Sequence, residues 1–419
     1  MSHTVEILSV GTELLLGNIA NTDAQMLSQG LSGLGLNVYW HTVVGDNPQR
    51  AREAVAIAKQ RADVIITTGG LGPTCDDLTK NVLAEAFGKK LVFDEDSAQR
   101  IRDWFARNKR TMTDNNLQQA MLPEGCTVLV NDWGTAPGCA FQAEGVHVIM
   151  LPGPPSECRP MFLHRAVPYL QTLSEGVIAS HTLKLFGIGE SSMEAQLRDK
   201  MNAMTNPTLA PYAKEGECEL RVTAKAASDE EAQALLRPTV EQVKQLFGPL
   251  VYGVDVPSLE AVVLEGLKSR GLTLGTAESC TGGLMAKRLT DISGASAVFK
   301  GGIVSYTNEV KAQLLQVPAP LLRQFGAVSA QVAAAMAEGA RQALGCDVAL
   351  SSTGVAGPDR DENGNEVGTA FVAIAVPGET YVRPLRLGTR PMRERIRTQV
   401  ASHAFDLVRR YLSGLPYQD

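Results

Sequence analysis

The chain has 419 residues, more than one ordinary hydrophobic core accommodates, so two or three domains are expected. Hydrophobic residues make up 44% and charged residues 20%, as in globular proteins, and a formal net charge of −6 without a basic block disfavours nucleic acid as a direct partner. We recognise no signal peptide, no apolar run as long as a membrane span, and no C-x-x-C pair among seven scattered cysteines, which predicts a cytoplasmic protein with reduced thiols and no membrane contact.

The first part of the chain alternates strand-like and helix-like segments. In chain order these are a strand at 5–10, a helix at 21–34, a strand at 38–44, a helix at 48–61, a strand at 64–68 and a helix at 78–87. Such alternation indicates a parallel α/β sheet with crossover helices, in which ligands bind at the carboxyl ends of the strands.

Glycines and carboxylates gather just beyond these strand ends. The loop 69–79 contains Gly69, Gly70 and Gly72, whose backbone amides could approach a phosphate, or which could simply form a structural turn. The carboxylates near the strand ends could hold a divalent cation such as Mg²⁺ or could cap helices. They are Asp46, Asp76 and Asp77.

Residues 177–252 are predicted to form a small α+β module. Strands are expected at 181–186 and 217–226, and helices from about residue 191 and over 230–246. This module shows no self-sufficient set of catalytic residues, and the proline-containing stretch 249–257 is predicted to be a linker.

The alternation of helices and strands resumes in the third part of the chain. In order, we predict a helix to 269, a strand at 272–274, a helix, a strand at 302–306 and a helix near 308. A helix at 330–344, a strand at 348–352, paired strands at 369–376 and 380–387, and a closing helix at 391–412 follow. This pattern predicts a second α/β domain.

Ser279 stands on a tight turn between the predicted strand at 272–274 and the helix pattern that begins at Leu284. The first amides of a helix have no partner within the helix and can face an anion or a developing oxyanion. A serine held there is either a nucleophile or an ordinary N-cap residue. The turn by itself does not decide between these two roles.

Two later segments favour the nucleophile. Lys311 lies one helical turn after Asn308, the predicted N-cap, and Tyr306 ends the preceding strand. A serine hydroxyl needs a base, and His403, the single histidine of this part, lies on the final helix. A lysine whose pKa is lowered by burial could serve as that base, although most lysines are solvated surface residues. Thr353 ends a third strand and could join the same site.

Together the segments around Ser279, Tyr306–Lys311, 326–329 and 352–358 resemble the nicotinamide-nucleotide amidase (PncC) domain. The resemblance implies hydrolysis of the carboxamide of nicotinamide mononucleotide (NMN) to nicotinate mononucleotide and ammonia, without a cofactor. It implies that Ser279 is the nucleophile and that Lys311, Tyr306 and Thr353 are catalytic partners. The substrate contacts that we expect in this domain are Thr281, Gly282, Gly283, Asn308, Ser329 and Gly354.

The first part, with its loops 69–79, 131–138 and 151–155, resembles the MoaB/MogA-like molybdopterin-binding domain, and the middle part resembles a KH-like module. The order of the three resembles the CinA (competence/damage-inducible) family. This resemblance implies a multi-domain α/β protein with an N-terminal MoaB/MogA-like domain at 1–170, a KH-like module at 177–252 and an amidase domain at 255–419. It also implies a homodimer.

Some members of that family hydrolyse ADP-ribose with a divalent metal, which makes the N-terminal domain a second candidate site. By this resemblance Asp46, Asp76 and Asp77 are candidate metal ligands, with Glu13 and Asn21 nearby. The candidate substrate contacts are Gly69, Gly70, Gly72 and Thr79. The remaining alternative is a competence- or damage-associated protein without enzymatic activity.

Overall fold

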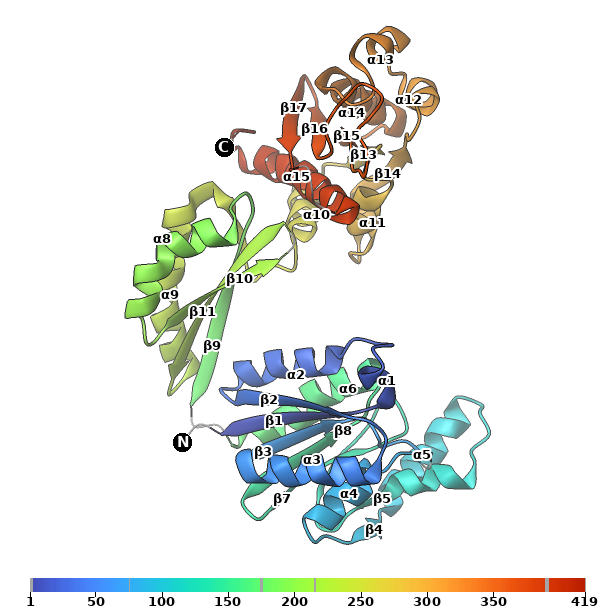
Figure 1. Ribbon diagram of the computed structural model, residues 1–419, viewed down its shortest axis with the longest axis vertical. Coiled ribbons are helices and arrows are strands. Elements are labelled where there is room, and N and C mark those ends of the chain that lie inside the picture. The colour runs from blue at the N-terminus through green and yellow to red at the C-terminus, as the bar shows by residue number, and fades with distance from the viewer. Residues whose placement is uncertain (1–2, 75, 174–175, 215, 389–391, 419) are drawn as a thin grey trace. The chain divides into compact units, whose positions relative to one another are not determined.

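The computed structural model describes residues 3–418 except 75, 174–175, 215 and 389–391 (Figure 1). The chain forms two compact units, residues 1–180 with 224–235, and residues 181–223 with 236–419. Most of the middle module therefore belongs to the second unit. The predicted fold class is confirmed, since an α/β sheet, a small α+β module and a second α/β sheet follow one another along the chain.

The N-terminal domain is built on a six-stranded sheet of order β2-β1-β3-β8-β7-β6. Its strands are β1 (Thr4–Val10), β2 (Asn37–Val44), β3 (Val64–Thr68), β6 (Thr127–Leu129), β7 (Gly138–Ala143) and β8 (Val146–Leu151). Strands β2, β1, β3 and β8 are parallel, but β7 and β6 are antiparallel to their neighbours, so the prediction of a parallel sheet is wrong at this edge. Glu144 and Gly145 both have positive φ, 53° and 82°, and such a two-residue turn joins antiparallel strands.

Helices cover both faces of this sheet (Figure 1). One face packs Leu8, Ile65 and Met150 against α3 (Pro48–Arg61) and α4 (Thr79–Ala86). The other face packs its own apolar residues, Ile7 among them, against α2 (Thr22–Gly33) and α6 (Pro155–Met161). The remaining elements are α1 (Thr12–Leu15), β4 (Leu91–Phe93), α5 (Glu95–Arg107), η1 (Asp114–Ala120), β5 (Met121–Pro123), η2 (Phe162–Ala166) and α7 (Val167–Gln171).

The middle module has a four-stranded sheet of order β10-β11-β9-β12. Its elements are β9 (Val177–Leu185), α8 (Glu190–Ala203), β10 (Thr208–Lys214), β11 (Glu217–Ala226), α9 (Asp229–Phe247), η3 (Gly248–Leu250) and β12 (Val251–Val254). The two helices begin within two residues of the predicted positions.

The C-terminal domain has a five-stranded sheet of order β14-β13-β15-β16-β17. Its strands are β13 (Leu274–Glu278), β14 (Phe299–Val304), β15 (Val348–Gly354), β16 (Thr369–Val376) and β17 (Glu379–Arg386). Strands β14, β13 and β15 are parallel, and β16 and β17 add an antiparallel edge.

The predicted strand at 272–274 is placed too early, because the sheet continues to Glu278. All five residues of β13 are buried between two neighbouring strands. Small side chains suit this position: a Cβ added to Gly275 would lie 2.7 Å from Leu344 Cδ1. The extension places Ser279 directly after the last residue of the strand.

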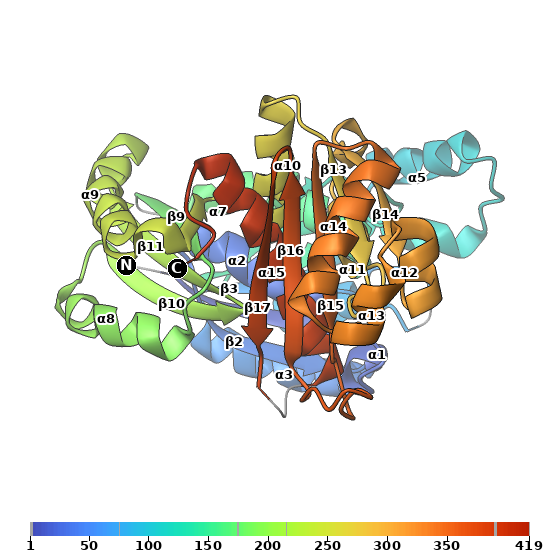
Figure 2. The ribbon, with the colours of Figure 1, turned by 90° about the horizontal axis from the view of Figure 1, so that it is seen from above.

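Two helical layers enclose this sheet. On one face lie α12 (Asn308–Leu315) and α14 (Ala330–Leu344), and Figure 2 shows α14 over the strands. The other face packs against α10 (Leu259–Ser269), α11 (Leu284–Thr290) and α15 (Arg393–Ser413). The short elements η4 (Ala295–Ala297) and α13 (Ala319–Phe325) complete the domain.

Residue 391, where the closing helix was predicted to begin, lies outside the described residues. No helix in the described part of the chain is long and apolar enough to cross a membrane.

Candidate active site

The carboxyl ends of three parallel strands bring the predicted residues of the C-terminal domain to one edge of the sheet. Ser279 follows β13, and its amide donates a hydrogen bond of 2.9 Å to the Ser352 carbonyl on β15. On the other side, Ser305 follows β14, and its amide donates 2.8 Å to the Glu278 carbonyl. Sheet pairing therefore fixes the start of the serine turn between its two neighbours.

Lys311 reaches this turn from α12. Its Nζ lies 3.2 Å from Ser279 Oγ, 2.8 Å from the Ser305 carbonyl oxygen and 3.4 Å from the Tyr306 carbonyl oxygen. The side chain is only 1% exposed although it carries an amine. The structure therefore brings together the serine and the lysine that the sequence placed 32 residues apart.

The environment of Lys311 favours a neutral amine. Burial lowers the pKa of Lys311 below that of an ordinary lysine, partly opposed by the charge of Glu309. Carbonyl oxygens can only accept, so a neutral amine gives its two N–H groups to the carbonyls of Ser305 and Tyr306. The lone pair of the nitrogen is then left for the hydroxyl of Ser279.

The neighbouring candidates for nucleophile and base do not fit these roles. Burial raises the pKa of Cys280 to about 12, so the thiol next to Ser279 stays protonated at neutral pH. His403 is partly buried on α15, with its ring 4.9 Å from that of Phe186, and desolvation lowers its pKa to about 4. The pair of Ser279 and Lys311 is thus the arrangement suited to nucleophilic chemistry.

A carboxylate that the sequence analysis did not single out accepts hydrogen bonds from the N-terminal amides of α11. Glu278 is fully buried and accepts hydrogen bonds from the amides of Met285, at 2.9 Å, and Ala286, at 2.8 Å. Its Oε2 also accepts from Thr281 Oγ1 at 2.7 Å, and the same hydroxyl lies 2.7 Å from Ser352 Oγ. The Thr281 side chain is fully buried, so its hydroxyl serves contacts within the protein, and the predicted substrate contact of this residue stays a prediction.

Two further hydroxyls predicted to serve the site are used inside the protein. Thr353 Oγ1 is buried and donates 2.7 Å to the carbonyl of Ala327. Ser329 caps α14, since its hydroxyl donates to the Gly326 carbonyl and accepts from the Val332 amide. Both side chains hold the loop 326–329 in place, and neither hydroxyl hydrogen is left to a substrate.

The predicted glycines shape the loops at this edge. Gly282 and Gly283 have φ values of 56° and 92°, and the Gly282 amide donates 3.1 Å to the Ser279 carbonyl. Such backbone favours glycine and makes the turn tight. Gly354 ends β15, where a Cβ would lie 2.5 Å from that of Ala370.

Tyr306 and Asn308 are at the surface of the site. Thr307, not Asn308, is the N-cap of α12, and its hydroxyl accepts from the Val310 amide. Tyr306 is 59% exposed, and its hydroxyl accepts a hydrogen bond of 3.2 Å from Arg393. Tyr306 and Asn308 both line a cavity of about 830 Å³, together with residues of the loop 326–329.

Two arginines of α15 reach the loops of the site, and the sequence analysis missed both. Arg393 donates 2.6 Å to the Gly357 carbonyl in the loop after β15, in addition to its contact with Tyr306. Arg397 donates 2.6 Å to the Thr281 carbonyl in the serine turn. Their spacing of four residues puts both guanidinium groups on one face of the helix.

The N-terminal domain has a separate cavity of about 590 Å³ at the carboxyl ends of its strands. It is lined by the predicted glycines Gly69, Gly70 and Gly72. Five carboxylates also line it, namely Glu13, Asp46, Asp76, Asp77 and Glu157. The fold thus brings the predicted glycines and acids of this domain into one pocket.

Some of the predicted residues of this domain form hydrogen bonds within the protein. Asp46 accepts 2.9 Å from the Thr12 amide, and Asp77 accepts from the amide and hydroxyl of Thr74 at 2.8 and 2.6 Å. Thr79 is buried and its hydroxyl donates 2.9 Å to the Gly69 carbonyl, so it fixes the loop instead of facing the pocket. The predicted neighbour Asn21 is the N-cap of α2.

Among the residues that the structure describes, no three His, Cys, Asp or Glu side chains lie close enough together to hold a metal ion. Mg²⁺ is commonly bound by only one or two carboxylates, and substrate phosphates and water complete its coordination. The acids of this pocket fit that mode of binding and do not fit a site made entirely of protein ligands.

Three family models cover nearly the whole chain. The model described as the CinA C-terminal domain matches residues 256–412, and a probable molybdopterin binding domain matches residues 6–172. The model of the damage-inducible protein CinA KH domain matches residues 180–253.

Full-length relatives are similar over the same extent. A CinA-like protein of Dictyoglomus turgidum is 49% identical, and one of Kosmotoga olearia is 46% identical; each alignment covers 98% of this chain and 99% of the relative. Among solved structures, a CinA superfamily protein of Klebsiella pneumoniae is 31% identical over 37% of this chain and 96% of that chain, with a TM-score of 0.36. A CinA protein of unknown function from Thermoplasma acidophilum is 31% identical over 40% of this chain and 98% of that chain, with a TM-score of 0.37.

Proposed function

Because this chain belongs to the CinA family, we propose that its C-terminal domain is a nicotinamide-nucleotide amidase that converts NMN to nicotinate mononucleotide and ammonia. The observation that carries the proposal is the 3.2 Å contact between Ser279 Oγ and the buried amine of Lys311. A serine activated by a lysine is suited to acyl transfer from an amide, and it needs neither a histidine nor a metal.

In the proposed reaction, Ser279 Oγ attacks the carboxamide carbon while Lys311 Nζ takes the hydroxyl proton. The tetrahedral intermediate collapses as the protonated Lys311 gives that proton to the leaving nitrogen, and ammonia departs. Water, deprotonated by the same amine, then attacks the acyl-serine ester; Lys311 returns this proton to the departing Ser279 Oγ, and the carboxylate product is released. We propose the Cys280 amide, directly after the nucleophile, as a donor to the developing oxyanion.

An anionic nucleotide suits the surroundings of the serine turn. Arg393 and Arg397 bring two positive charges to the loops of the site and could hold a 5′-phosphate. The exposed ring of Tyr306 offers a face to the cationic pyridinium ring of the substrate. We therefore propose that α15 and Tyr306, and not the amide end of α11, receive the nucleotide.

Ammonia release from NMN by the purified full-length protein tests the proposal. Ser279→Ala and Lys311→Met are expected to abolish release, whereas Lys287→Met is expected to leave it unchanged. Lys287 is a suitable control because it is an exposed lysine of α11 paired with Asp291. Unchanged release in either of the first two variants would refute the serine–lysine mechanism.

The pocket of the N-terminal domain supports a second proposed activity, the metal-dependent hydrolysis of ADP-ribose to AMP and ribose 5-phosphate. The supporting observation is that glycine loops and five carboxylates line one cavity large enough for a nucleotide. AMP formation in the presence of Mg²⁺ is expected to persist in Ser279→Ala. If neither ammonia nor AMP is formed, the non-enzymatic alternative of a competence- or damage-associated protein is favoured.

A further inference from the structure

We infer that Glu278 is a positioning residue that holds the nucleophile turn in register with Lys311. Its buried carboxylate ties the turn to α11, and its main chain ties the same strand end to the carbonyl that orients the lysine. The inference rests on the proposed serine–lysine pair, and it adds a residue that acts on the pair without contacting the substrate.

The side chain of Glu278 helps to position Ser279. Its carboxylate accepts from the hydroxyl of Thr281, which lies 2.7 Å from the hydroxyl of Ser352. The carbonyl of Ser352 in turn accepts the amide of Ser279. Three hydrogen bonds thus connect the carboxylate to the main chain of Ser279 by way of Thr281 and Ser352, in addition to the covalent bond between residues 278 and 279.

The main chain of Glu278 helps to position Lys311. Its carbonyl accepts the amide of Ser305 at 2.8 Å, and the carbonyl of Ser305 accepts from Lys311 Nζ at 2.8 Å. A displacement of Glu278 therefore moves the nucleophile and the acceptor that orients the base at the same time.

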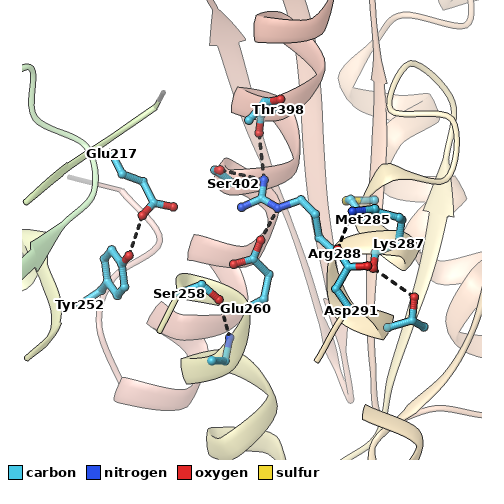
Figure 3. A network of polar contacts seen from close by, with 12 residues as sticks. Glu217, Tyr252, Ser258, Glu260, Met285, Lys287, Arg288, Asp291, Thr398 and Ser402 are labelled. Atoms are coloured by element: carbon cyan, nitrogen blue, oxygen red, sulfur yellow. Dashed lines mark hydrogen bonds and ion pairs between the residues drawn. The ribbon is translucent and has the colours of Figure 1, made fainter. Parts of the chain in front are cut away.

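The helix to which the carboxylate is tied is itself held firmly. Arg288 of α11 forms an ion pair with Glu260 of α10 and donates to the Thr398 carbonyl and the Ser402 hydroxyl of α15, at 3.2 and 3.0 Å (Figure 3). Because two neighbouring helices fix α11, the bonds from the Met285 and Ala286 amides to the carboxylate place the turn against a rigid element.

A carboxylate is needed here because the groups around it are donors. Two backbone amides and the hydroxyl of Thr281 give hydrogens to the two oxygens of Glu278. A glutamine of the same shape has one oxygen and one NH₂ group, which would face a backbone N–H as a second donor. Glu278→Gln therefore displaces the turn while it preserves the volume of the buried side chain.

A matched carboxylate at the opposite end of the same strand provides the control. Asp347 accepts from the amide and the hydroxyl of Thr273, at 2.8 and 2.7 Å, immediately before β13. It performs the same structural task for the start of β13, away from the serine turn. Both bonds go to one oxygen, which an asparagine can supply, so Asp347→Asn reports the cost of removing the charge of a carboxylate beside this strand.

The experiment compares the full-length wild type with Glu278→Gln and Asp347→Asn in two assays. The first measures kcat and KM for ammonia release from NMN, and the second measures the rate at which a fluorophosphonate probe labels Ser279, followed by intact mass spectrometry. We expect Glu278→Gln to lower kcat and the labelling rate roughly 100-fold, as small misplacements of reacting groups do, and to change KM less than about threefold. Asp347→Asn should leave both rates near those of the wild type.

The two assays separate the failure of this inference from the failure of the proposed substrate. A wild type that is labelled at Ser279 but releases no ammonia refutes the proposed activity, and the labelling rates still test Glu278. Wild-type rates in folded Glu278→Gln, or equal losses in Glu278→Gln and Asp347→Asn, overturn the inference. If Glu278→Gln does not fold, Thr281→Val replaces it, because that variant removes the hydroxyl linking the carboxylate to Ser352 and should lower kcat in the same way. A wild type inactive in both assays overturns the inference together with the serine–lysine pair.

Discussion

Both α/β domains bury a lysine, and the two lysines differ in what faces the amine. Lys80 of α4 is 3% exposed and donates to the carbonyls of Gln118 and Gln119, at 3.1 and 2.8 Å, and burial lowers its pKa to about 8. Lys311 also donates to two carbonyls, but its Nζ lies within 3.2 Å of the hydroxyl of Ser279. Burial and a lowered pKa are thus common to both domains, and the adjacent hydroxyl distinguishes the candidate base from a structural lysine.

Removing each amine in turn tests the difference between the two lysines most strongly. Lys311→Met should lower kcat for ammonia release by about 10³-fold or more, because the serine loses its base. Lys80→Met should leave kcat unchanged and lower Tm, since it removes two hydrogen bonds in the other unit. Parallel kinetics and thermal unfolding of the two variants check this expectation, and equal losses of activity would contradict it.

The acidic pocket provides a second contrast, because its five carboxylates need a cation to bind a phosphate. EDTA should abolish AMP formation from ADP-ribose, and Asp77→Asn should lower it by roughly 100-fold, because the cation that neutralises the phosphates is lost or weakened. Ammonia release from NMN should be insensitive to EDTA. AMP formation that persists in EDTA would exclude a metal-dependent reaction in this pocket.

The pH dependence sharpens the role of Lys311. The amine is a base only when neutral, so kcat/KM should rise about tenfold per pH unit while Lys311 is protonated and level off above its pKa. Because burial lowers this pKa, the plateau should begin below the value of about 10.4 of an ordinary lysine. Lys80→Met should not shift the profile, and a rise that continues to the range of a solvated lysine would argue against a buried base.

The smallest expected effect concerns the arginines of α15. Arg397→Ala should raise KM for NMN by about tenfold with little change in kcat, because one charge near the substrate phosphate is lost. Arg395→Ala is the control, since Arg395 is an exposed arginine of the same helix. An unchanged KM in Arg397→Ala would place the phosphate elsewhere, and the cavity lined by Tyr306 would be the next region to test.

Much of the fold followed from the sequence because apolar periodicity records burial directly. Helix α3 and strand β3 have the predicted bounds, and helix α14 begins and ends at Ala330 and Leu344 as expected. The end of β13 was missed because Gly275 to Glu278 contain small and charged residues, and their burial depends on strands distant in sequence. The antiparallel edge of the first sheet depends on a turn between Ala143 and Val146.

The site was predictable to a smaller extent. Ser279 and Lys311 follow from local turn chemistry and from the need for a base, and the fold places them in contact. Small hydroxyl side chains look alike in sequence whether they bind a ligand or hold a loop, so the contacts that Thr281 and Thr353 make within the protein could not be predicted. Arg397 could not be found at all, since only the tertiary fold brings α15 to the serine turn.

The burial of Lys311 has a consequence for covalent labelling. An amine that is 1% exposed is shielded from reagents in bulk solvent, which modify the exposed lysines first. An electrophile carried by a nucleotide would instead be delivered to the side of Ser279, whose hydroxyl lies 3.2 Å from Lys311 Nζ. A substrate-shaped affinity label can therefore tag Lys311 selectively, although it is among the least accessible amines of the chain to ordinary reagents.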